Sequence, residues 1–111
     1  MSKIKRVYSK LTLEALTLIG QQIKLARKQK KMSEKEMASR AGIARSTLQK
    51  IELGNPQVDI GFVFEVAILS GVPLFEADAT SLAPHIDRMK DKLALMPTYI
   101  RMSKRELKND F

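Results

Sequence analysis

The chain has 111 residues and a formal net charge of +8, with 44% hydrophobic and 5% aromatic residues. This length allows one small domain with additional segments, and the core must be aliphatic and methionine-rich because tryptophan is absent. The absence of cysteine excludes disulfides and thiolate metal sites, and a single histidine disfavours a zinc site. No apolar run reaches the length of a membrane span.

Basic residues are concentrated in the first half of the chain. Residues 1–50 carry a net charge of +10, residues 51–100 carry −4, and the last eleven residues carry +2. Such asymmetry is typical of proteins that bind a polyanion, although a charge run alone is more often a solvated surface. The first ten residues are expected to form a basic arm, which either adds phosphate contacts or is a frayed end.

The first predicted helix is long. It should begin at Ser9 or Thr12 and end near Lys30 or Lys31. Gly20 lies inside this pattern and weakens a helix by about 1 kcal/mol relative to alanine. The apolar residues at helical spacing, which we expect to face the core, are Leu11, Ala15, Ile19, Ile23 and Ala26.

The stretch from Ser33 to Leu53 predicts two short helices joined by a tight turn. Ser33 can cap the first helix through its hydroxyl group, and Glu36 can complete a capping box. Gly42 can adopt the positive φ that ends a helix and redirects the chain. The second helix is expected from about Arg45 to Leu53. This layout is typical of a DNA-binding helix-turn-helix.

The sequence from about Leu18 to Phe75 resembles the Cro/C1-type repressor family, on the residues LIGQQIKLARKQKKMSEKEMASRAGIARSTLQKIELG. In that family an arginine of the first helix commonly pairs with a glutamate near the end of the recognition helix. The resemblance implies a structural salt bridge between Arg27 and Glu52. Ala44 departs from the pattern, because such proteins often carry serine or threonine as the helix cap at this position. Alanine cannot accept the capping hydrogen bond, and the loss of that bond typically costs about 1 kcal/mol.

A fourth and a fifth helix should follow the Asn-Pro loop after the recognition helix. Asp59 can cap the fourth helix, which should run to about Leu69 and end at Gly71. This helix is apolar nearly all round, so it should be buried in the domain or in a dimer interface. Pro73 suits the start of a short fifth helix with the sequence PLFEA.

The last predicted helix starts near Pro84 and ends at Met96. Its apolar stripe must be buried in its own domain or on a partner, and consists of Ile86, Met89, Leu93 and Met96. The sequence thus predicts an all-α chain with a basic arm (1–10), a compact five-helix helix-turn-helix domain (11–82), a C-terminal amphipathic helix (83–96) and a flexible basic tail (97–111).

A helix-turn-helix places the N-terminal half of its second helix in the major groove of DNA. Arg45 is the best base reader, since its guanidinium group matches the O6 and N7 acceptors of guanine. The expected base-reading residues are Arg45, Ser46, Gln49 and Lys50, and the family resemblance favours Lys50 over Gln49. The expected phosphate contacts are Ser33, Thr47, Lys28, Lys31 and Lys35.

A closer resemblance rests on the segments VPLFEAD and DKLALMP and on the basic tail that ends in DF. From about Tyr8 to Phe111 the chain is similar to HipB-like antitoxins, which are encoded beside HipA-type kinase toxins. This resemblance implies a cytoplasmic, nucleoid-associated homodimer that represses its own operon at a palindromic operator and binds its toxin.

Two other interpretations compete with an antitoxin. The chain could be a stand-alone phage-type or metabolic regulator without a toxin, or a helical adaptor whose basic face holds an acidic protein. Binding to duplex DNA that weakens with salt separates the adaptor from the regulators. An enzyme is the least favoured class, because the sequence has no paired carboxylates, nucleophile–base set or phosphate-binding glycine loop, and no cofactor is expected.

Overall fold

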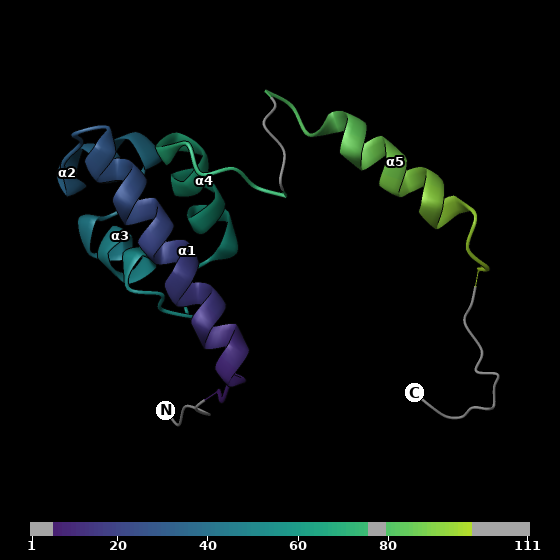
Figure 1. Cartoon of the computed structure of the whole chain (residues 1–111), viewed down its shortest axis with the longest axis horizontal. Helices are drawn as coiled ribbons and strands as arrows, with labels where there is room; N and C mark the ends of the chain where they lie inside the picture. The colour runs from purple at the N-terminus through teal and green to yellow at the C-terminus, as the bar shows by residue number, and fades with distance from the viewer. Residues whose placement is uncertain (1–5, 76–79, 99–111) are drawn as a thin grey trace. The chain divides into compact units, whose positions relative to one another are not determined.

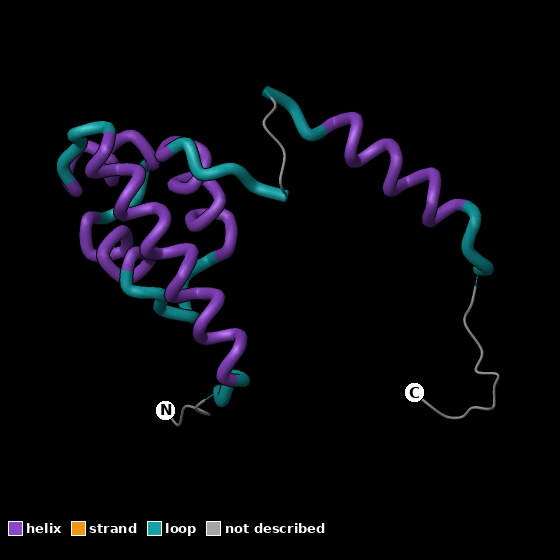
Figure 2. The backbone as a smooth tube through the Cα atoms, viewed as in Figure 1, coloured by secondary structure: helices purple, strands orange, loops and turns teal. Residues whose placement is uncertain are grey.

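The computed structural model describes residues 6–75 and 80–98. These residues form five helices and no strand, which confirms the all-α class. The helices are α1 (Lys10–Gln29), α2 (Glu34–Ala41), α3 (Arg45–Glu52), α4 (Ile60–Ser70) and α5 (Ala83–Ala94), and short loops join the first four (Figures 1 and 2). Contacts divide the chain into two units, Met1–Glu76 and Ala77–Phe111, and each is described by itself.

The first helix, α1, begins and ends where the sequence predicts. Ser9 is the N-cap, and its hydroxyl oxygen accepts a hydrogen bond from the Thr12 amide at 3.2 Å. Lys30 is the C-cap of the helix. Lys31 then adopts a positive φ of 59°, which an L-residue reaches only at some cost in free energy. This left-handed residue turns the chain from α1 into α2.

Gly20 has a structural role that its helix propensity does not reveal. The helix continues through this residue, which is buried where α1 crosses the end of α3. A methyl group on Gly20 would lie 2.5 Å from the carbonyl oxygen of Ile51 and 2.7 Å from that of Glu52. Only glycine allows this approach, so the propensity lost within α1 is offset by closer packing against α3.

The core of the first unit lies between its four helices. In Figure 1, α1 crosses the group formed by the other three, and it packs against α3 and α4. The second helix, α2, also packs against α3 and α4. The buried apolar side chains are aliphatic or methionine, as the composition predicts, and are Ile23, Met37, Ala38, Leu48, Ile51, Val66 and Ala67.

The first two turns of α1 differ from the prediction. Ile23 is fully buried and Ile19 packs against the core, but Leu11 is 74% exposed and Ala15 is also exposed. The purple end of α1 extends beyond the other helices of its unit in Figure 1. Helical spacing places these residues on one face, but none of the helices described in this unit covers that face near the start of α1.

The fourth helix, α4, ends at Gly71 as predicted, with a φ of 87°. Asp59 is its N-cap by position, but the Asp59 side chain accepts no capping hydrogen bond, contrary to the prediction. Val66 and Ala67 are buried, whereas Ile68 is 60% exposed. One side of this apolar helix therefore packs on the core and the other side faces outward.

The short helix predicted from Pro73 does not begin in residues 73–75, which are not helical. Phe75 adopts a positive φ of 57°, which is incompatible with a right-handed helix. Its ring instead packs edge-to-face on Phe64, with 6.2 Å between ring centroids. The rest of the predicted segment includes residues 76 and 77, which lie outside the described residues.

The second unit contains α5, which has Pro84 in its first turn as predicted. No residue of α5 is buried. The residues of the predicted apolar stripe are 56% to 65% exposed, namely Ile86, Met89, Leu93 and Met96. The predicted basic tail lies outside the described residues from residue 99 onward, and so do residues 1–5 of the predicted N-terminal arm.

Candidate nucleic-acid interface

Two local signals fix the path of α2. The Ser33 hydroxyl oxygen accepts a hydrogen bond from the Glu36 amide at 3.0 Å, as predicted for an N-cap. The reciprocal bond of a capping box does not form, and the Glu36 carboxylate accepts a hydrogen bond from Arg40. At the other end, Gly42 has a φ of 72°, and the Ile43 amide donates to the Ala38 carbonyl oxygen at 3.0 Å. These bonds end α2 and set the direction in which α3 leaves.

The third helix, α3, begins without a side-chain cap. Ala44 is its N-cap and makes no side-chain capping bond, as its methyl group dictates. The Ala44 carbonyl oxygen nevertheless accepts from the amides of Thr47 at 3.0 Å and Leu48 at 3.1 Å. Backbone hydrogen bonds to the Ala44 carbonyl therefore form the first turn of α3 although the side-chain capping bond is missing.

The two faces of α3 are chemically opposite. Leu48 and Ile51 are buried in the core, and they fix the rotation of the helix about its axis. The four side chains predicted to read bases are all exposed and belong to the first six residues of the helix, namely Arg45, Ser46, Gln49 and Lys50. The arrangement presents hydrogen-bonding groups on one surface of a rigidly packed helix, as entry into a major groove requires.

The residues predicted to contact phosphates lie on three elements. Lys28 is at the end of α1 and Lys31 follows it, while Ser33 caps α2 and Lys35 lies in its first turn. All four are exposed, whereas Thr47 on α3 is half-buried. The amide groups at the start of α2 belong to the same region, and a helix N-terminus favours negative charge.

Arg27 and Glu52 form a buried ion pair that joins α1 to α3. Their side chains are 6% and 4% exposed. Arg27 Nε donates to Glu52 Oε2 at 2.7 Å, and its Nη2 donates to Oε1 at 3.1 Å. Arg27 Nη1 donates to the Met32 carbonyl oxygen at 2.9 Å. The hydrogen bonds with Glu52 raise the pKa of Arg27, so the guanidinium group stays charged despite its burial.

Glu34 is a residue of this surface that sequence reasoning missed. Its Oε1 atom accepts hydrogen bonds from Arg45 Nε at 2.9 Å and from Gln49 Nε2 at 3.0 Å. Its other oxygen, Oε2, lies 4.0 Å from Arg27 Nη2. The hydrogen bonds from Gln49 and Arg45 lower the pKa of Glu34. An acidic residue in the first turn of a helix is an ordinary dipole-stabilising feature, so the sequence gives no signal for these contacts.

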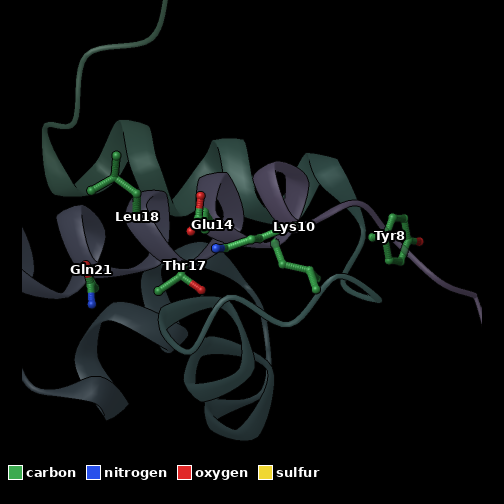
Figure 3. Close-up of a pocket in the computed structure, with 7 residues that line it drawn as sticks. Tyr8, Lys10, Glu14, Thr17, Leu18 and Gln21 are labelled. Atoms are coloured by element: carbon green, nitrogen blue, oxygen red, sulfur yellow. The ribbon is translucent and has the colours of Figure 1, made fainter.

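The first unit carries several surface hollows, including one beside α3 and one along the start of α1. One, beside α3, is lined by Thr47, Lys50, Asn55, Gln57, Val58, Asp59 and Phe62. It adds the polar side chains of the loop after α3 to the candidate interface. The other, shown in Figure 3, lies along the start of α1 and is lined by Tyr8, Lys10, Leu13, Glu14, Thr17, Leu18 and Gln21. In neither lining is a hydroxyl group hydrogen-bonded to a base, the arrangement that covalent catalysis needs.

Neither a metal-binding cluster nor a membrane helix is found in the described residues. Across 6–75 and 80–98, no group of three or more His, Asp or Glu side chains is placed to hold a metal ion. Within the same ranges, every helix is too short or too polar to span a bilayer.

Comparison with known proteins identifies the first unit. Residues 23–76 match the model of a family described as helix-turn-helix, and the match spans the last third of α1, all of α2, α3 and α4, and the segment after α4. No curated protein and no solved structure matches the chain significantly. The matched segment contains the capped α2, the Gly42 turn and the exposed polar face of α3. The match therefore supports a helix-turn-helix domain of the Cro/C1 type within residues 23–76, and with it a DNA-binding transcription regulator.

Proposed function

We propose that this chain is a homodimeric transcriptional repressor that reads a palindromic operator with α3. One observation carries the proposal. Leu48 and Ile51 are buried and fix the rotation of the helix about its axis. Among its first six residues Thr47 is half-buried, and every exposed side chain is polar or charged. A protein that reads operator DNA works in the cytoplasm, in association with the nucleoid.

The roles of the exposed residues follow from their chemistry. Arg45 offers a planar donor pair to guanine, and Gln49 offers one donor and one acceptor, which suits adenine. Lys50 donates to guanine acceptors, and Ser46 can donate or accept at a base edge. Ser33, Thr47 and the lysines around α2 then hold the domain on the phosphate backbone, which fixes its register without reading sequence.

One observation and one symmetry argument support self-association. Leu25 on α1 and Ile68 on α4 are 59% and 60% exposed, which leaves large apolar side chains on the surface of the first unit. A single domain of this size covers one half-site, and two half-sites related by two-fold symmetry provide the affinity that one module lacks. A palindromic operator is the DNA counterpart of that symmetry.

The direct experiment is selection of bound duplexes from a random pool by the full chain, followed by sedimentation of the protein alone and with the selected duplex. The proposal expects a two-fold symmetric consensus and a dimer on one duplex. The half-site centres should lie about 34–36 Å apart or a multiple of this spacing. A pool that remains random after selection, at moderate salt, contradicts the proposal.

The proposal extends to a toxin partner, so that the protein is the antitoxin of a HipBA-like module. The exposed apolar stripe of α5 supports a protein partner, since a short amphipathic helix gains stability when that stripe is covered. The test is co-purification with the product of the adjacent reading frame, using the full chain and a chain truncated after Met96. Failure of the full chain to bind a kinase-like product encoded beside it contradicts this extension and leaves the repressor proposal standing.

A further inference from the structure

We infer that Glu34 is a specificity-determining positioning residue, which holds Arg45 and Gln49 as one reading unit and disfavours binding to unrelated DNA. The inference rests on the proposed function and goes beyond it. Glu34 contributes no donor to a base. Its effect is exerted through the two side chains that donate to it.

The geometry shows how one carboxylate can position the two base-reading side chains, Arg45 and Gln49, which we call the readers. Arg45 Nε and Gln49 Nε2 donate to the same atom, Glu34 Oε1, at 2.9 and 3.0 Å. Arg45 and Gln49 are both exposed, and long exposed side chains normally sample several rotamers. The shared acceptor reduces that freedom before DNA arrives, and it couples the position of one reader to that of the other.

The bonds to Glu34 leave the reading atoms free. Arg45 donates to Glu34 through Nε only, so its Nη1 and Nη2 groups can still donate to O6 and N7 of a guanine. Gln49 donates through one N–H of Nε2, which leaves the second N–H and the oxygen for a base edge. A reader can therefore contact its base and keep its bond to Glu34, so the contact supports base reading without blocking it.

Glu34 is itself held in place from the other side. Its Oε2 atom lies 4.0 Å from Nη2 of Arg27, and the Arg27 side chain is fixed by the buried hydrogen bonds with Glu52. The Glu34 side chain is only 26% exposed. A rigid cation beside the Glu34 carboxylate limits the movement of that carboxylate. The positions of Arg45 and Gln49 are therefore tied to the core of the domain through Arg27.

The negative charge of Glu34 has a second effect. Glu34 is the first residue of α2, near the proposed phosphate contacts Ser33 and Lys35. Non-specific DNA affinity comes almost entirely from neutralising phosphates, and an acidic group in that region opposes it. On the operator, the ordered readers offset this repulsion through their base contacts. On unrelated DNA the same repulsion acts without those base contacts. The charge therefore lowers both affinities alike, and the discrimination comes from the positioned side chains of Arg45 and Gln49.

The test compares Glu34→Ala with Glu36→Ala in the full chain. Glu36 lies in the same first turn of α2 and carries the same charge, but its carboxylate bonds Arg40 and neither reader. Each protein is titrated with the selected operator duplex and with a scrambled duplex at the same salt concentration. Glu34→Ala should lower the ratio of the two affinities by roughly tenfold, as expected for residues in direct contact. Glu36→Ala should strengthen both affinities alike and leave the ratio unchanged.

A second pair of variants distinguishes positioning from loss of structure. Glu34→Gln keeps an acceptor oxygen for Arg45 and Gln49. Its ratio of operator affinity to scrambled-duplex affinity should therefore stay close to that of the parent, unlike that of Glu34→Ala. In an Arg45→Ala/Gln49→Ala background, Glu34→Ala should change the ratio no further, since both side chains it positions are absent.

Two results separate failure of this inference from failure of the proposed function. A parent chain that binds operator and scrambled duplexes equally overturns both. A parent that prefers its operator, together with a Glu34→Ala variant whose ratio equals that of Glu36→Ala, overturns the inference alone.

Discussion

The helices α3 and α5 are both short and amphipathic, yet only one of them has its apolar face covered. Leu48 of α3 is fully buried, whereas Leu93 of α5 is 65% exposed. Isolated helices of up to about 12 residues are marginal in water, so both depend on contacts beyond their own backbone. The fold supplies those contacts to α3 through α1 and α2. The comparison shows that periodicity defines an apolar face but does not say what covers it.

This difference also separates two kinds of surface. Because its apolar face is held by the core, α3 presents a polar surface of fixed geometry, which suits recognition of a regular duplex. The apolar face of α5 is exposed, which suits contact with a protein surface. The variants below test this contrast, in order of decreasing expected effect.

The largest effect is expected from Glu52→Ala, which removes one partner of the buried pair in the first unit. Arg27 would then be left as a buried charge without a counter-ion, at a typical cost of about 3–5 kcal/mol of unfolding free energy. Thermal and urea unfolding measure this loss. The control is Arg27→Met/Glu52→Leu, which should recover most of the stability because no unpaired charge remains. A melting temperature of Glu52→Ala equal to that of the parent would remove the structural role from this pair.

The contrast between the helices is tested directly by Leu48→Ala and Leu93→Ala. Truncating the buried leucine should cost about 2–5 kcal/mol of unfolding free energy. Truncating the exposed leucine should change it by less than about 0.5 kcal/mol in dilute protein. Urea unfolding of both variants gives the comparison. Equal losses would mean that the stripe of α5 is covered within the folded chain.

Gly20→Ala tests the close approach of α1 to α3. The added methyl group would meet the Ile51 carbonyl oxygen at 2.5 Å, and such overpacking costs about 1–3 kcal/mol of unfolding free energy. The matched control is Gly61→Ala in α4, where a methyl group meets nothing within 4 Å. That substitution should stabilise the protein by about 0.5–1 kcal/mol through helix propensity. Stabilisation by both substitutions would show that α1 and α3 can separate without cost.

The smallest expected effect is the pH-dependent contribution of Glu34 to the free energy of unfolding. Its pKa is lowered in the folded protein by hydrogen bonds from Gln49 and Arg45. The resulting stabilisation is present above the unfolded pKa and is lost as pH falls through the folded value. Glu34→Gln should therefore be less stable than the parent near neutral pH, and the difference should shrink toward about pH 3. Urea unfolding at both pH values checks this, and a difference that grows on acidification would contradict it.

Much of the fold could be predicted because its signals are local. The Ser9 cap of α1, the Ser33 cap of α2 and the left-handed Gly42 depend on nearby backbone atoms, and they lie where the sequence predicts. The turn at Phe75 was not predicted, because its positive φ accompanies a packing contact with Phe64 eleven residues earlier.

The candidate site was predictable to a similar extent. The exposed face of α3 follows from periodicity, since burial of Leu48 and Ile51 determines which residues point outward. The bonds from Arg45 and Gln49 to Glu34 join positions 11 and 15 residues apart in sequence. They depend on the angle between α2 and α3, which no spacing rule supplies. The same reason applies to Gly20. Its low helix propensity is visible in the sequence, whereas its close contact with α3 depends on how α1 packs against that helix.

The most direct test of the whole account is the binding of Arg45→Ala to the selected operator, to single-base variants of it and to a scrambled duplex. The account predicts a loss of about 1–3 kcal/mol on the operator and a relaxed preference at one base position in each half-site. Binding to the scrambled duplex should fall much less. An equal loss of affinity on operator and scrambled DNA, with the preference at every base position intact, would contradict sequence reading by α3.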